Sequence, residues 1–287
     1  MPRYLLAVFA LLVSLPLAAQ EPIRFARTPD ISPDGKLVAF SYLGDIWTVE
    51  AIGGVARPVT MHEAHDLWPC ISPDGRQIAF SSNRHGGYDV FVTAIHGGKP
   101  KRLTFDSGHD TVTGWTPDGK YVVFSSTRSP GYPGNPEVFT VPVEGGQEKR
   151  INLFEGKEAY FSPTGLHLAF VSGPGLWYRK GYRGSSNDDI WISAADGANP
   201  RKVTTFNGQD TSPMWSPDGK KLYYVGETPE KPGIANIVSQ DVQPDSASPT
   251  NGTPKALTTT ARNSSAGRGS ARTANGSSTN AGPISSS

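Results

Sequence analysis

The sequence predicts an all-β fold, a β-propeller built from four-stranded blades. Pro-Asp-Gly, or a close variant of it, recurs five times, with the prolines at 33, 73, 117, 163 and 217. The spacings are therefore 40, 44, 46 and 54 residues, and a period near 40 residues with one tight turn per copy is typical of propeller blades. Short apolar runs of strand length flank each copy.

The repeated motif suits a tight turn at each position. Residues 32–35 read Ser-Pro-Asp-Gly, where Ser can hold the first corner, Pro presets φ at the second and Gly can take positive φ. Turns of this kind commonly join antiparallel strands, so each motif predicts a hairpin.

Further strands are expected after each turn. The second strands are predicted at 37–41, 78–80, 121–124, 168–170 and 222–224. The third strands are predicted at 45–49, 88–92, 137–141 and 189–192, with Gly-Gly or Asp-Gly turns at 53–54, 97–98, 145–146 and 196–197. A short fourth strand ends on Val59-Thr60, Leu103-Thr104 and Val203-Thr204. Four strands per repeat form a propeller blade, which buries its faces only by stacking on neighbours.

Five blades are recognisable within residues 23–258, at about 23–61, 62–105, 106–151, 152–205 and 206–258. Residues 259–287 contain no acidic and no aromatic residue, which predicts a disordered low-complexity tail. This tail starts where a sixth blade is expected, so the sixth blade is missing or incomplete. We interpret this as a lost reading frame or a truncated gene near residue 260.

Residues 1–20 are predicted to be a secretory signal peptide. Arg3 supplies the positive start, residues 4–17 form an apolar run that is short for a membrane span, and Ala18-Ala19 suits cleavage nearby. An uncleaved N-terminal anchor is the alternative. We expect a periplasmic or secreted protein without a stable membrane span after cleavage.

The composition argues against several classes of function. With 27 basic and 26 acidic residues, the net charge of +1 gives no reason to expect nucleic acid as a partner. Cys70 is the single cysteine, so no internal disulfide can form.

Polar pairs precede the first strand of three blades. His65-Asp66, His109-Asp110 and Gln209-Asp210 occupy equivalent positions, so their side chains should meet at one mouth of the propeller channel. One interpretation is a polar or metal-binding ring. The other, which we favour, is that each Asp caps its own turn and ties blade to blade, because no ligand set of fixed geometry is apparent. No metal and no cofactor are therefore predicted.

Residues 173–189 form an insertion between the second and third strands of blade four. It holds Arg179, Lys180, Tyr182 and Arg183, and such a cluster could hold the carboxylate end of a peptide. A solvated loop whose aromatic side chains pack on the blade edge is an equal alternative.

Catalytic motifs are not apparent. The sequence has no Gly-x-Ser-x-Gly elbow, and residues 62–65 read His-Glu-Ala-His, one residue short of the zinc-binding His-Glu-x-x-His spacing. No catalytic residue is assigned, and binding is the default activity.

The repeats resemble the WD40-like Pro-Asp family found in TolB and in tricorn-type proteases. The insertion segment 180–184, Lys-Gly-Tyr-Arg-Gly, followed by Asp-Ile-Trp-Ile at 189–192, is similar to the matching part of the tricorn protease six-bladed propeller. The resemblance covers about residues 23–258. It implies a propeller that gates or filters peptides for a serine peptidase whose catalytic Ser and His lie in other domains. Whether this chain is itself an enzyme is left open.

Three hypotheses follow. The first is a truncated, non-catalytic propeller portion of a tricorn-like peptidase that binds or gates peptides. The second is a stand-alone TolB-like periplasmic scaffold that binds proteins. The third is a lyase or hydrolase that uses the channel-mouth His and Asp residues. Five blades would also leave open propeller edges, from which we expect self-association.

Overall fold

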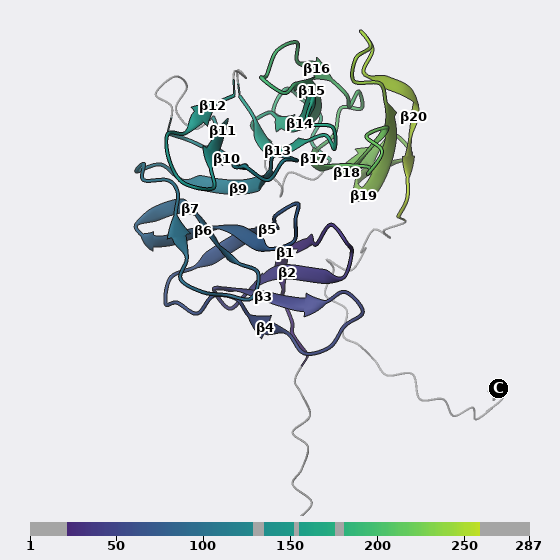
Figure 1. Cartoon of the computed structure of the whole chain (residues 1–287). Helices are drawn as coiled ribbons and strands as arrows, with labels where there is room; N and C mark the ends of the chain where they lie inside the picture. Colours follow the sequence, from purple (N-terminus) through teal and green to yellow (C-terminus); the bar gives the residue numbers. More distant parts are fainter. Residues whose placement is uncertain (1–21, 129–134, 152–154, 176–180, 259–287) are drawn as a thin grey trace, which may run out of the picture. The chain divides into compact units, whose positions relative to one another are not determined.

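The computed structural model describes residues 22–128, 135–151, 155–175 and 181–258. Its described residues form twenty strands and no helix (Figure 1). The strands make five four-stranded sheets, each paired in sequence order. The predicted all-β class, a β-propeller of four-stranded blades, is confirmed. The proposed signal peptide, 1–20, and the proposed tail, 259–287, lie outside the described residues.

The strand bounds follow the repeat. Blade one contains β1 (Arg27–Ile31), β2 (Leu37–Tyr42), β3 (Asp45–Glu50) and β4 (Arg57–Pro58). Blade two contains β5 (Asp66–Ile71), β6 (Gln77–His85), β7 (Gly87–Ala94) and β8 (Lys101–Arg102). Blade three contains β9 (Asp110–Trp115), β10 (Tyr121–Ser126), β11 (Glu137–Pro142) and β12 (Lys149–Arg150).

The last two blades are built in the same way. Blade four contains β13 (Lys157–Phe161), β14 (His167–Ser172), β15 (Asp189–Ala194) and β16 (Arg201–Lys202). Blade five contains β17 (Asp210–Trp215), β18 (Lys221–Thr228), β19 (Lys231–Val242) and β20 (Thr250–Ala256). The sequence pattern did not identify β19, which is 12 residues long.

The Ser-Pro-Asp-Gly motifs form the turns between first and second strands. In blade one the Ser32 hydroxyl donates to Asp34 Oδ1 at 2.6 Å and accepts from the Leu37 amide at 2.9 Å. Gly35, at φ 71°, donates its amide to the Ser32 carbonyl. Blades two and five repeat this network, and in blade four Thr164 replaces the aspartate and hydrogen-bonds Ser162. These bonds satisfy the polar groups of the turn, so the motif recurs wherever a blade starts.

A threonine closes the outer edge of three blades. The fourth strands are only two residues long and end just before the apolar-Thr pairs, rather than on them as predicted. In blade one the Val59 amide donates to the Ile46 carbonyl, and the Thr60 hydroxyl accepts from the Ile46 amide. Thr104 and Thr204 do the same in blades two and four. The side-chain oxygen replaces the next carbonyl of the ladder, so backbone pairing stops there.

Apolar clusters hold the blades together. The described residues divide into two compact units: 22–115 with 119–122 and 141–148, and the other described residues up to 258. In the first unit, Ile46 of blade one packs with Ile78, Phe80 and Phe91 of blade two. In the second, Ile190 of blade four packs with Leu222 and Tyr224 of blade five. In both pairs, one face of a blade is therefore covered by the next blade of the same unit.

Two blade faces are exposed at positions that are buried elsewhere. In blade five, Ile237 is 41% exposed and Leu257 56% exposed, although their counterparts in blade four, Ile190 and Val203, are 0% and 3% exposed. In blade one, Ile31 is 55% exposed, whereas its counterpart Ile71 is 7% exposed.

We predict that Ser72→Ala lowers the free energy of unfolding by about 1 kcal/mol, because Ser72 is buried and both donates to Asp74 and accepts from the Gln77 amide. Urea unfolding would measure this. Ser72→Thr is the matched control, because Thr116 makes the same bond to Asp118 in blade three. Equal loss in both variants would contradict the role of the hydroxyl.

Candidate functional site

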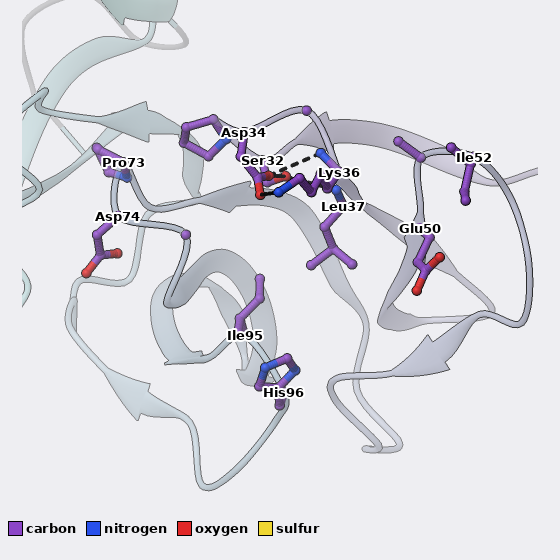
Figure 2. A pocket seen from close by; sticks show the side chains of 14 residues that line it. Ser32, Asp34, Lys36, Leu37, Glu50, Ile52, Pro73, Asp74, Ile95 and His96 are labelled. Carbon is purple, nitrogen blue, oxygen red and sulfur yellow. Dashed lines mark hydrogen bonds and ion pairs between the residues drawn. The ribbon is translucent and has the colours of Figure 1, made fainter.

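The turns of blades one and two border a cavity of about 730 Å³ (Figure 2). Its lining comes from four turns: residues 32–37, 50–52, 73–75 and 95–96. Alternate turns lie at the same end of an antiparallel sheet, which places all four at one end of the two blades. The whole cavity belongs to the first compact unit.

The cavity lies where one turn glycine lacks the proline neighbour that it has in later blades. A Cβ built on Gly119, Gly165 or Gly219 would lie 3.7 to 3.8 Å from the proline of the preceding blade's turn. A Cβ built on Gly75 would have no atom within 4 Å, so Pro33 is further away. Turns two to five are thus packed against one another in succession, and the gap lies between turns one and two.

The inner part of the cavity is apolar. Figure 2 shows Leu37 of blade one and Ile95 of blade two on facing sides of this space. Both belong to or pack against the cluster that joins the two blades. Ile95 is 8% exposed, so the cavity reaches down to the edge of the core.

The rim of the cavity is mainly acidic. It carries the carboxyl groups of Asp34, Glu50 and Asp74 against one ammonium group, that of Lys36, which lies 3.5 Å from Asp34. The Ser32 hydroxyl and the Lys36 amide lower the pKa of Asp34, and Ser72 and the Arg76 amide lower that of Asp74. In the described part of the chain, Glu50 and His96 have no ion-pair or side-chain hydrogen-bond partner. This arrangement can accept a cation beside an apolar surface.

The structure places two predicted channel-mouth residues in a local network of blade two. Asp66, the first residue of β5, is fully buried and receives both hydrogen bonds from Nη2 of Arg84, at 2.9 and 3.0 Å. The Arg84 guanidinium also lies 4.8 Å from the Phe91 ring centroid. His65 donates its amide to Asn83 at 2.7 Å. Asp66 is thus held by a cation of its own blade.

Blade three has a similar arrangement. Asp110 is the first residue of β9 and is buried. Arg128 lies over the Phe124 and Phe139 rings at 5.2 and 5.1 Å, as Arg84 does in blade two. His109 accepts a hydrogen bond at Nδ1 from the Tyr88 amide, at 3.2 Å.

Asp210 takes the same position in blade five without an arginine. It pairs with Gly226 in the strand register, as Asp66 pairs with Ser82, so Thr228 stands where blade two has Arg84. Asp210 is 1% exposed, and burial raises its pKa to about 7. The nearby Thr204 hydroxyl lowers this pKa, while the charges of Asp189 and Glu227 raise it further. That these aspartates form a ring around a channel stays a prediction.

The blade-four insertion is anchored through a buried glutamate. Glu227 of β18 accepts hydrogen bonds from the Gly181 amide at 3.2 Å and from Arg183 at 2.7 Å. The Arg183 guanidinium also lies 4.8 Å from the Phe206 ring centroid. Arg183, one of the predicted peptide-binding residues, is therefore engaged within the protein. Tyr182 lies in the described loop, whereas Arg179 and Lys180 lie outside the described residues.

Sequence reasoning missed the cavity and two arginines, Arg84, which holds Asp66, and Arg128, which lies over the Phe124 and Phe139 rings. A sequence signal for these arginines was present, because each follows a Ser-Ser pair at the end of a second strand. The two segments are 81–84 and 125–128. No sequence signal marked the cavity, because every repeat carries the same kind of turn. Within the described ranges, no group of three His, Cys, Asp or Glu side chains could hold a metal ion, and no helix could cross a membrane.

Comparison with known proteins finds one family across most of the chain. The family described as "Tricorn protease N-terminal beta propeller domain" matches residues 23–264. A tricorn protease homolog of Streptomyces coelicolor is 31% identical over 191 residues, which is 65% of this chain and 18% of that protein. The Tol-Pal system protein TolB of Xylella fastidiosa is 36% identical over 83 residues, which is 29% of this chain and 18% of TolB.

The fold similarity extends over most of the strands. The crystal structure of the tricorn protease superposes with a TM-score of 0.68 at 22% identity, covering 82% of this chain and 22% of the protease. The chain thus spans about a fifth of the length of these relatives.

We predict that Asp210 makes the protein less stable as the pH rises. Its folded pKa of about 7 lies above its ordinary value of 3.8, so the folded state binds the proton more tightly. The free energy of unfolding should fall by up to about 4 kcal/mol between about pH 4 and pH 7 and then level off. In Asp210→Asn this part of the fall is absent, which urea midpoints measured across that range would show.

Asp66→Asn is the matched control at the equivalent position. It leaves the partly buried Arg84 side chain, which is 11% exposed, without its carboxylate, so it should destabilise the protein at pH 7 by about 3 kcal/mol. If the free energy of unfolding depended on pH in the same way in both variants, the proposed difference between Asp66 and Asp210 would be contradicted.

Proposed function

Because the chain belongs to the tricorn protease N-terminal beta propeller family, we propose that it is a non-catalytic propeller module that binds peptides or gates them for proteolysis. The match of the family over residues 23–264 carries this proposal. Hydrolysis itself would belong to other domains, as the relatives are several times longer than this chain. The cavity between blades one and two, about 730 Å³ in volume, supports the proposal because it is large enough for a polypeptide side chain.

We place the carboxylate end of a bound peptide at the blade-four insertion. Arg183 is engaged by Glu227, so Arg179, Lys180 and Tyr182 are the candidates for direct contact. Arg183 supports them by fixing the far side of the loop on β18. The aspartates Asp66, Asp110 and Asp210, with His65 and His109, are proposed to stabilise the blades rather than bind ligands.

We predict that Arg179→Ala combined with Lys180→Ala weakens the binding of unstructured peptides with a free carboxylate by about ten-fold, because a charged pair is lost. Fluorescence anisotropy with one labelled peptide, free or amidated at its C-terminus, measures the loss. Lys220→Ala, which removes an exposed cation in a Pro-Asp-Gly turn, is the control and should have no effect. If no peptide binds the unmodified protein, the proposed function is wrong.

A TolB-like scaffold that binds folded proteins is the second candidate function. The similarity to the Tol-Pal system protein TolB favours it. Binding of a folded partner without any binding of unstructured peptides would select this alternative. In both cases we propose export to the periplasm, which the apolar run at residues 4–17 supports.

We also propose that the open blade faces cause self-association. The faces at Ile31 and at Ile237 with Leu257 are exposed where other blades bury the same positions. We predict a sedimentation coefficient that rises with concentration, and a smaller rise in the double variant Ile237→Ser, Leu257→Ser, because its apolar face is reduced. Tyr121→Ser, at an exposed apolar position in blade three, is the control. A single species at all concentrations would contradict this proposal.

A further inference from the structure

The cavity between blades one and two has the chemistry of a site for a basic side chain. It combines an apolar interior, Leu37 and Ile95, with a rim of three carboxyl groups and one ammonium group. Lysine and arginine side chains have this dual character, an apolar stem that ends in a cation. An acidic ligand would meet uncompensated negative charge at the same rim.

The carboxyl groups that would meet the cation can be distinguished by their partners. Asp34 is already close to Lys36, at 3.5 Å. Glu50 has no ion-pair partner in the described part of the chain, and Asp74 keeps Oδ2 outside the turn bonds that Oδ1 accepts. Figure 2 shows Glu50 and Asp74 on opposite sides of the cavity, so each side of it carries a negative charge.

The blade geometry explains why the site is at this junction. The turns of blades three, four and five each place a glycine against the proline of the preceding turn. Gly75 has no such neighbour, so the stem of a long side chain can pass between turns one and two and reach Leu37 and Ile95. A site of this volume holds the side chain together with part of its backbone.

We propose that this cavity binds an arginine or lysine side chain of a polypeptide segment, with Glu50 and Asp74 on the cation and Leu37 and Ile95 on the stem. The proposal rests on the proposed function, peptide binding, and assigns it a second subsite and a side-chain preference. The segment belongs to another polypeptide. The cavity selects its side chain by charge and by the length of the apolar stem.

The test uses fluorescence anisotropy with the full chain and two labelled hexapeptides, Gly-Gly-Leu-Arg-Gly-Gly and the same peptide with Glu in place of Arg. The arginine peptide should bind about ten-fold more tightly at low ionic strength, and the difference should shrink in high salt. Glu50→Lys reverses an exposed charge on the rim and should weaken the arginine peptide about ten-fold. Ala51→Trp fills the cavity from an exposed position and should weaken both peptides.

Glu144→Lys is the matched control, because Glu144 lies at the exposed turn between β11 and β12, outside the cavity. If the arginine peptide binds Glu50→Lys and Ala51→Trp as tightly as the unmodified protein, the cavity is not its site, although peptide binding itself would stand.

A variant with Arg262, Arg268 and Arg272 all replaced by Gln should bind as the unmodified protein does. Tighter binding by that variant would mean that the chain's own tail fills the cavity, which overturns the proposal.

Discussion

Burial of the blade faces is the constraint on which the rest of the structure depends. A four-stranded antiparallel sheet with apolar residues on both faces cannot be stable in water by itself, because each face exposes a row of apolar side chains. In this chain Ile46 and Ile190 are fully buried because the next blade covers them, whereas their counterpart in blade five, Ile237, is 41% exposed. The repeated turns and threonine closures keep the sheets alike, so that one blade fits on another.

The need to bury the blade faces also determines how the blades accommodate charged side chains. An aspartate at the start of the first strand is buried between apolar layers, where its carboxylate is costly without a partner. Blade two meets this cost with Arg84, whose planar group also covers two phenylalanine rings. Blade five has no arginine there, and Asp210 is accommodated by a pKa raised to about 7. The same repeated residue is therefore accommodated in two different ways, by an ion pair in blade two and by a raised pKa in blade five.

Because the blades repeat one pattern, the places where a blade departs from that pattern indicate where function can lie. The turn of blade two lacks the glycine-to-proline contact that the later turns make, and a cavity with an acidic rim occurs there. The insertion of blade four interrupts an otherwise short connection and is secured by Glu227 on β18. Binding functions commonly reside where loops depart from the regular scaffold.

The sequence by itself determined the fold class, because the Pro-Asp-Gly turns and the period near 40 residues require only local chemistry to be recognised. It also located the blade-four insertion and the family resemblance, which the match over residues 23–264 confirmed. The long strand β19 escaped notice because its turn lacks the repeated motif. Tertiary structure alone decided that Arg84 reaches Asp66, that Arg183 is held by Glu227, and that turns one and two leave a cavity. These contacts depend on distances between residues that are far apart in the chain. The repeat pattern in the sequence does not contain those distances, because it is nearly the same in every blade.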